Sequence, residues 1–240
     1  MLPVYPAVFF FRRYMMFKLS RIPDKTLDFD NDNRETYKVA VLGSCKGAGA
    51  SFVSERVLKD GLLEGHTPEG LRTLCEMGSP YFYTALGFEK RFIGRPFYEF
   101  SSHGKHELNM ELGYNWYVKR PNDIVIDEKG ILKNLYNAVG SLEIYDCSGL
   151  WEEKILFDIL DESDLIYFVI DPMPTKLISF SKFIDEIISC YGKAKLVVNK
   201  YEKGIHRGEL SKFLGTSDYH VIPFVPIEKI YRAEYNCLML

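Results

Sequence analysis

Short, mostly apolar runs alternate along the chain with longer segments in which apolar residues recur every three or four positions. The apolar runs lie at 37–42, 71–76, 115–119, 142–146, 164–171, 195–202 and 220–226. The periodic segments lie at 51–63, 131–139, 151–160, 177–190 and 228–235. Near-continuous apolar runs suit strands that are buried on both faces, which is typical of a parallel sheet covered by helices. The pattern therefore predicts an α/β fold in three layers, with a mostly parallel central sheet flanked by helices.

The length of the chain suits one such domain, which we place at residues 37–240. The chain has 240 residues, of which 47% are hydrophobic, and this is enough to bury a full core. Residues 1–36 stand apart, because an aromatic stretch interrupted by Arg12 and Arg13 is followed by polar sequence without the features of a signal peptide. Three interpretations stay open for this segment: an arm that packs on the domain or on a partner, a segment at a membrane surface, or sequence upstream of a start at Met16.

Charge and cysteine usage narrow the class of protein. The formal net charge of −3 argues against a general nucleic-acid binder, which would carry a basic domain. The five cysteines form no CxxC pair, which favours buried thiols in a reducing cytosol over a disulfide framework. No run of apolar residues is long enough for a transmembrane helix. We therefore expect a cytoplasmic protein without sequence-specific nucleic-acid binding.

The segment 81–100 is unusually aromatic and carries interleaved bases at Lys90, Arg91 and Arg95. Such a mixture can stack on nucleic-acid bases. In an acidic chain with a single patch of this kind, a surface facing a protein partner or a second copy is a better functional interpretation. A plain contribution to the hydrophobic core is the structural alternative.

A glycine-rich loop joins the first predicted strand to the first predicted helix. Gly43, Gly47 and Gly49 would let successive backbone N–H groups turn toward an anion, and the helix that follows would add its positive N-terminal end. In the ordinary phosphate-binding loop the last glycine precedes Lys and then Ser or Thr. Here Ala50 and Ser51 follow Gly49, so the hydroxyl is kept and the lysine is absent.

Further along the chain, three other predicted strands carry polar residues at or near their carboxyl ends. Glu76 ends the second strand, Asp146 ends the strand at 142–146 and is followed by Gly149, and Asn199 lies near the end of the strand at 195–202. Glu76 could instead be an ordinary acid at a strand end, and Asp146 with Gly149 could form a structural turn.

These landmarks together resemble the MinD/ParA family of P-loop ATPases, whose loop reads K-G-G-x-G-K-[ST]. With Gly49 and Ser51 aligned, the family's signature lysine falls on Cys45 and its P-loop lysine on Ala50. The loop is therefore a degenerate form of the deviant Walker A motif. Lys46 lies one position from the signature site and could substitute for that lysine. The resemblance covers about residues 37–236 and implies the Rossmann-like P-loop NTPase fold, although 81–129 departs from the family pattern.

The resemblance implies a site for ATP or ADP with Mg²⁺. The residues expected to hold the phosphates are Gly43, Lys46, Gly47, Ala48, Gly49, Ala50, Ser51 and Phe52. Ser51 and Asp146 would hold Mg²⁺, and Asp146 with Glu76 would act on the attacking water. Gly149 would sense the γ-phosphate, and Asn199 with Pro226 would contribute to the base pocket. Adenine is favoured by the resemblance, with guanine as the minority alternative because the acid after Asn199 is Glu202.

Three functions follow from the resemblance as hypotheses. The first is a nucleotide-binding switch with weak or absent hydrolysis that works as a homodimer. It would position a partner, as the atypical members similar to TadZ do for a pilus or secretion machine at a cell pole, or as partition proteins do, with peripheral contact to the inner membrane. The second is a pseudo-ATPase scaffold that binds protein partners without nucleotide. The third is an active ATPase rescued by Lys46 or by a lysine from a partner subunit.

Overall fold

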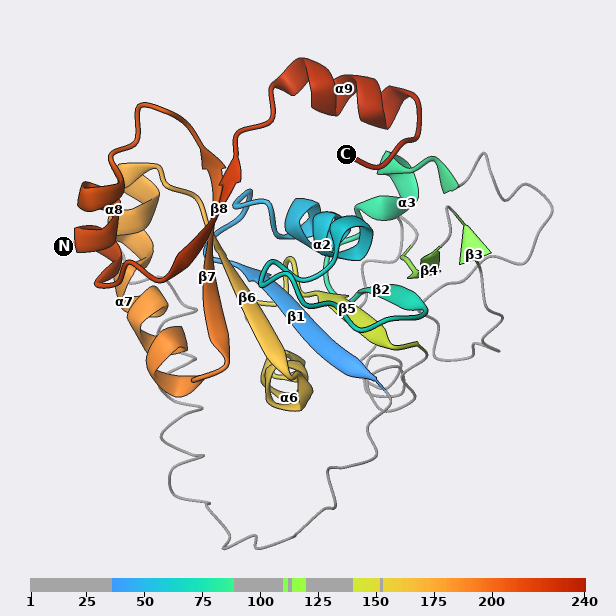
Figure 1. Cartoon of the computed structure of the whole chain (residues 1–240), viewed down its shortest axis with the longest axis horizontal. Helices are drawn as coiled ribbons and strands as arrows, with labels where there is room; N and C mark the ends of the chain where they lie inside the picture. The colour runs from blue at the N-terminus through green and yellow to red at the C-terminus, as the bar shows by residue number, and fades with distance from the viewer. Residues whose placement is uncertain (1–35, 89–109, 112–113, 120–139, 152) are drawn as a thin grey trace, which may run out of the picture.

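The computed structural model describes residues 36–88, 110–111, 114–119, 140–151 and 153–240. Within them an eight-stranded sheet runs in the order β3-β4-β2-β5-β1-β6-β7-β8 (Figure 1). Neighbouring strands pair in parallel, except that β3 runs antiparallel to β4. The strands are β1 Tyr37–Gly43, β2 Arg72–Glu76, β3 Met110–Glu111, β4 Tyr114–Tyr117, β5 Leu142–Asp146, β6 Leu165–Ile170, β7 Ala194–Tyr201 and β8 Tyr219–Pro223. The helices are α2 Ala50–Asp60, α3 Phe82–Ala85, α6 Ile155–Glu162, α7 Pro174–Cys190, α8 Arg207–Leu214 and α9 Ile227–Tyr235.

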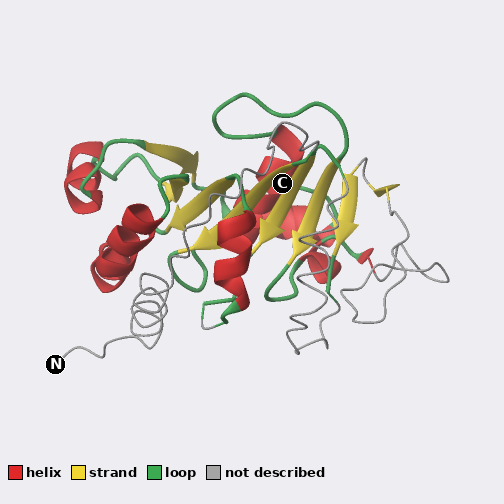
Figure 2. Ribbon diagram, turned by 90° about the horizontal axis from the view of Figure 1, so that it is seen from below, coloured by secondary structure: helices red, strands yellow, loops and turns green. Residues whose placement is uncertain are grey.

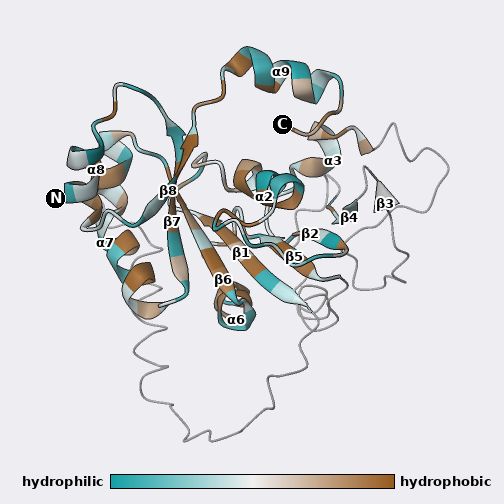
Figure 3. Cartoon of the chain, viewed as in Figure 1, coloured by the Kyte–Doolittle hydropathy of each residue, from teal (hydrophilic) through white to brown (hydrophobic). Residues whose placement is uncertain are grey.

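Helices cover both faces of the twisted sheet and so make three layers (Figure 2). On one face, residues of α2 and α3 share a core with Val39 and Val41 of β1. On the other face, residues of α6, α7 and α8 share a core with Ala40 and Leu42. Successive residues of β1 thus point into opposite cores, as the two-residue period of a strand requires. Figure 3 shows hydrophobic residues concentrated along the central strands. Their near-continuous apolar sequence follows from burial in a core on each face of the sheet.

The central position of β1 determines where the glycine-rich loop lies. β1 pairs with β5 on one side and with β6 on the other, with Val41 opposite Asp146 and Gly43 opposite Val169. The carboxyl ends of β5, β1 and β6 therefore meet at one edge of the sheet. In open α/β sheets this edge is where ligands bind.

The structure confirms the predicted α/β class and the mostly parallel sheet, with some differences in the helices. Helix α8 was not predicted, because only Leu210 and Leu214 of its residues are buried and its sequence is otherwise polar. Helix α6 begins later than predicted, at Ile155. Helix α7 begins earlier, at Pro174, since a proline in the first turn costs no intrahelical hydrogen bond. The N-terminal segment 1–35 and the predicted helix at 131–139 lie outside the described residues, so the domain start at residue 37 stays a prediction.

The described part of the aromatic segment contributes to the core. Phe82 and Phe88 are buried and flank Trp116, with ring centroids 5.7 and 5.5 Å from the indole. Such tilted and edge-on contacts are the favoured geometries of aromatic pairs. The structural interpretation therefore holds for 81–88, whereas 89–100 lies outside the described residues.

Two further expectations concerned free thiols in place of disulfides and the lack of a transmembrane helix. All five cysteines are free thiols, and Cys75 and Cys147 are buried. Across the described ranges, the helices are too short or too polar to cross a lipid bilayer.

The C-terminal residues return to helix α2. The backbone N–H of Leu240 donates to Glu55 Oε1 at 2.5 Å, and Lys59 Nζ donates to the carbonyl oxygen of Leu240 at 3.1 Å. Glu55 is buried among these contacts, although it belongs to a helix whose sequence is rich in charge. Burial raises the pKa of Glu55 to about 7, against the opposing effects of the Leu240 hydrogen bond and the charge of Lys59.

This raised pKa predicts a pH-dependent stability. Between about pH 4.5 and pH 7 the folded chain holds a proton on Glu55 that the unfolded chain releases, so the free energy of unfolding falls as pH rises through that window. Glu55→Gln cannot titrate and should lose this slope, which amounts to at most about 3 kcal/mol. Urea unfolding at about pH 5 and about pH 8 measures the difference. Glu69→Gln, at an exposed position, is the control; a Glu55→Gln slope equal to that of this control would contradict the prediction.

Candidate functional site

The glycine-rich loop forms a compact turn between β1 and α2. Gly47 and Gly49 have φ angles of 80° and 95°, in the left-handed region that favours glycine. The N–H of Ala48 donates to the carbonyl oxygen of Cys45 at 3.1 Å, which closes the turn. A Cβ atom on Gly49 would lie 2.2 Å from Asn199 Nδ2, so β7 approaches the loop too closely for any side chain there. Gly47 and Gly49 thus shape the loop, while their expected part in phosphate binding stays a prediction.

Helix α2 presents an uncapped N-terminus directly after this loop. No side chain caps the helix at Gly49, and its first turn contains no acidic residue. The N–H groups of Ala50, Ser51 and Phe52 have no acceptor within the helix, because an α-helix leaves its first N–H groups unpaired. Together with the helix dipole, these donors make the loop attractive to an anion.

Asp146 lies buried beside Ser51 at the same edge of the sheet. Its Oδ1 accepts hydrogen bonds from the N–H and the hydroxyl of Ser148, at 3.1 and 2.6 Å. Its Oδ2 is buried without a hydrogen-bond partner among the described residues. Ser51 Oγ lies 3.1 Å from Ser148 Oγ. Burial raises the pKa of Asp146, and the hydrogen bonds from Ser148, together with the nearby Ser51 hydroxyl, oppose that rise.

The donors around Asp146 fit Mg²⁺. A buried carboxylate oxygen without a partner costs free energy unless something satisfies it. Mg²⁺ binds oxygen ligands, keeps several waters and is usually held by one or two carboxylates together with phosphate oxygens. Asp146 Oδ2 and the Ser51 hydroxyl are oxygen donors of this kind, next to a loop suited to phosphate. The structure thus brings together the two residues that were expected to hold the metal.

The turn after β5 is fixed against the segment that follows β2. The N–H of Met77 donates to the carbonyl oxygen of Asp146 at 2.9 Å, and the N–H of Ser79 donates to that of Ser148 at 2.6 Å. Gly149, expected to sense a γ-phosphate, has a φ of 85° and packs against Ser79. The residues after Asp146 are therefore held in place by their neighbours.

Glu76 is placed at this edge but is occupied by the backbone. Its carboxylate accepts hydrogen bonds from the N–H groups of Tyr81, of Phe82 at 2.9 Å and of Lys119 at 2.7 Å. Burial raises the pKa of Glu76 to about 8, and these donors oppose the rise. Both carboxylate oxygens are engaged, so the contacts support the structural interpretation, in which Glu76 fixes the start of α3 and the end of β4.

Asn199 and Pro226, the two residues expected at the base pocket, have different surroundings. Asn199 is buried, and its Nδ2 donates to the carbonyl oxygen of Ala48 at 2.9 Å, so this side chain supports the loop. A contact of Asn199 with a base would have to come from its carbonyl oxygen or from the second hydrogen of Nδ2. Pro226 is exposed directly before α9. Lys46, the candidate replacement for the family's lysine, is exposed on the loop.

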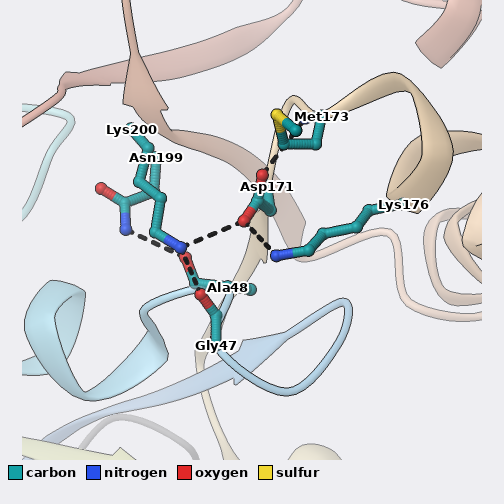
Figure 4. A network of polar contacts seen from close by, with 7 residues as sticks. All are labelled: Gly47, Ala48, Asp171, Met173, Lys176, Asn199 and Lys200. Carbon is teal, nitrogen blue, oxygen red and sulfur yellow. Dashed lines mark hydrogen bonds and ion pairs between the residues drawn. The ribbon is translucent and has the colours of Figure 1, made fainter.

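Sequence reasoning missed three charged residues beside the loop: Asp171, Lys176 and Lys200 (Figure 4). Lys176 Nζ and Lys200 Nζ both donate to Asp171 Oδ2, at 2.6 and 3.0 Å. Lys200 Nζ also donates to the carbonyl oxygen of Gly47, at 2.5 Å. Burial alone would raise the pKa of Asp171, but the hydrogen bonds from Lys176, Lys200 and the N–H of Met173 outweigh it and hold the pKa below its usual value. The available signal was that Asp171 and Lys200 also lie at the carboxyl ends of parallel strands.

Solved structures similar to this fold include MinD and ParA proteins. No protein-family model matches the chain, and no curated protein matches its sequence. A ParA family ATPase from Chlorobium tepidum aligns with a TM-score of 0.60 and 11% identity, over 86% of this chain and 91% of that chain. A putative plasmid partition protein from Borrelia burgdorferi bound to AMPPNP aligns at 0.59 and 14%, over 84% and 89%. The MinC:MinD cell division complex from Aquifex aeolicus aligns at 0.61 and 14%, over 85% and 87%.

The likeness confirms the three-layer α/β fold of the MinD/ParA-like P-loop NTPases. At this level of identity it speaks for the fold, and the chemistry has to be argued from the residues of this chain.

The contact between Gly49 and Asn199 gives a test of the loop geometry. Gly49→Ala should lower the free energy of unfolding by about 2 kcal/mol or more, because a left-handed non-glycine residue is strained and its Cβ would meet Asn199 Nδ2. Urea unfolding of the variant measures this cost. Gly192→Ala is the matched control, since a Cβ there meets open space.

A second substitution separates the two causes. Adding Asn199→Ala to Gly49→Ala should remove the clash but keep the backbone strain, so the two changes should not be additive. Equal stability of Gly49→Ala and Gly192→Ala would show that the loop differs from the structure described.

Proposed function

We propose that this protein binds a nucleoside triphosphate, with ATP as the favoured ligand, together with Mg²⁺ at the β1–α2 loop. It would act as a nucleotide-dependent positioning or regulatory switch whose hydrolysis is weak or absent. The observation that supports this most directly is the unpartnered buried Oδ2 of Asp146 beside Ser51. Without a ligand at this place, the fold would be more stable if that buried carboxylate were absent.

Each part of the site has a separate task in this proposal. The free N–H groups at the start of α2 and around Gly47 and Gly49 would bind phosphate oxygens. Ser51 and Asp146 would hold Mg²⁺, which supplies positive charge to the phosphates when bound. Lys46 is the cation that the loop itself offers, from an exposed position.

The charges present support binding more than hydrolysis. Cys45 and Ala50 occupy the two places where the MinD/ParA pattern has lysine. Phosphoryl transfer depends on positioning and on charges that stabilise the transition state, and loss of one such donor can cost on the order of 10²–10³ in rate. Glu76, the second expected catalytic acid, is already engaged by three backbone N–H donors. An active ATPase would need Lys46 or a partner's lysine to make up this loss.

The surface of α9 supports a protein partner or a second copy of the chain. Ile227, Tyr231 and Tyr235 form an exposed stripe at spacings of four residues on this helix, and the rings of Tyr231 and Tyr235 stack. Exposed apolar stripes of this kind mark interaction surfaces. A homodimer, a partner in a polar, pilus, secretion or partition machine, and peripheral membrane contact are therefore retained as part of the proposal.

The alternative is a scaffold that binds protein without nucleotide. It is favoured by one observation. Asn199 and Lys200 donate hydrogen bonds to the carbonyl oxygens of Ala48 and Gly47, and these bonds support the shape of the loop without a ligand. A titration with nucleotide decides between the two.

Calorimetric titration of ATP, ADP and GTP, with Mg²⁺ and with EDTA, tests the proposal. The wild type should bind ATP, and Mg²⁺ should strengthen that binding. Asp146→Asn keeps the shape of the side chain but removes its charge, so it should abolish the Mg²⁺ effect and weaken binding about tenfold or more. Ser51→Ala should act in the same direction.

Asp185→Asn, an exposed acid on α7, is the matched control and should bind as the wild type does. Absence of binding by the wild type at millimolar nucleotide would leave the scaffold. Turnover of bound ATP at the rate of an ordinary ATPase would instead support rescue by a lysine.

A further inference from the structure

We propose that Lys200 supplies, from the end of β7, a phosphate-binding cation in place of the lysines that Cys45 and Ala50 replace in the loop. The inference rests on the proposed function and adds a residue to it. On nucleotide binding, Lys200 Nζ would exchange its contact with Asp171 for a phosphate oxygen, while Lys176 keeps Asp171 neutralised. A lysine lost from the loop would in this way be replaced by one reaching it from another strand.

The position of Lys200 is the first observation. Its Nζ lies 2.5 Å from the carbonyl oxygen of Gly47, within the loop itself. Lys200 also adopts a φ of 56°, which is uncommon for a residue with a side chain. Strained backbone of this kind persists where the surrounding structure holds it, and it is concentrated at functional sites.

The sharing of Asp171 is the second observation. Asp171 is nearly buried, at 3% side-chain exposure, and its Oδ2 accepts from both lysines, with the shorter distance to Lys176. A buried carboxylate that loses its only cation is strongly destabilised. Because Lys176 would remain 2.6 Å away, release of Lys200 leaves Asp171 paired. Lys200 is therefore the lysine that can move at small cost, and its 39% side-chain exposure gives it room to do so.

The charge balance of the site is the third observation. Asp171, Lys176 and Lys200 together carry a net charge of +1 beside the loop, counting one carboxylate and two ammonium groups. The same three groups act electrostatically on Cys45, the position where the family's signature lysine would stand. The cluster thus places positive charge close to where the loop has lost it. Ammonium–phosphate hydrogen bonds are among the stronger ones in proteins.

Substitution of Lys200 tests the inference by titration of MgATP at low salt. Lys200→Met should weaken binding about tenfold or more and flatten its dependence on salt, because one ion contact is lost. Lys200→Arg keeps the charge and should retain most of the affinity. Lys203→Met, an exposed lysine three positions along the chain, has the same change in net charge and should bind as the wild type does.

Asp171→Asn distinguishes a charge effect from mere support of the loop. If Lys200 acts through its charge, removing the opposing carboxylate should leave MgATP binding as tight as in the wild type or tighter. If Asp171 and Lys200 only hold the loop in shape, Asp171→Asn should weaken binding as Lys200→Met does. That loss would overturn the inference, as would wild-type affinity in Lys200→Met or equal losses in the Met and Arg variants. Circular dichroism and urea unfolding of each variant confirm that it is folded.

The two proposals fail in different ways. If the wild type binds no nucleotide, the proposed function and this inference fall together. If the wild type binds MgATP and Lys200→Met binds it equally well, the inference alone falls and the nucleotide site stands.

Discussion

The glycine-rich loop depends on β7 for its shape. Asn199 and Lys200, neighbours in sequence at the end of that strand, donate to the carbonyl oxygens of Ala48 and Gly47. These two contacts occupy loop carbonyl oxygens, so they take up none of the N–H groups of the loop or of the first turn of α2. They are possible because β6 alone separates β1 from β7 in the sheet. The geometry of the loop therefore depends on the order of the strands in the sheet.

Two buried acids at this edge of the sheet have opposite surroundings. Asp171 is paired with two lysines, which hold its pKa low, whereas Asp146 has one oxygen without a partner and a raised pKa because of burial. A carboxylate that is already neutralised has no need of a cation, while an under-satisfied one attracts it. Of the acids at this edge, Asp146 is therefore the one suited to Mg²⁺. The carboxylate of Glu76 accepts three backbone N–H groups, which favours its structural interpretation; its expected role on the attacking water stays a prediction.

The sequence indicated those features that follow from burial and periodicity. Strands buried on both faces need apolar residues at almost every position, so β1, β5, β6 and β7 were found, while the largely exposed α8 was not. Ser51 and Asp146 were expected together because the resemblance to the MinD/ParA family implies that they hold Mg²⁺. The hydrogen bonds of Glu76 and Asn199 depend on the path of loops that no periodicity encodes. The sharing of Asp171 by two lysines required the strand order and the reach of long side chains, which a linear pattern does not contain.

The replacement of two loop lysines by Cys45 and Ala50 bears on how a switch of this kind would return to its nucleotide-free state. A ligand shifts a conformational equilibrium only by its difference in affinity for the two states. A protein that hydrolyses its nucleotide leaves the bound state through chemistry, whereas one that does not must release the intact ligand. Removal of positive charge from the phosphate loop weakens the attraction that slows this release. Lys200, which pairs with Asp171 in the absence of nucleotide, would restore part of the affinity for phosphate from outside the loop. The nucleotide-bound state would then follow the concentration of nucleotide rather than a hydrolysis cycle.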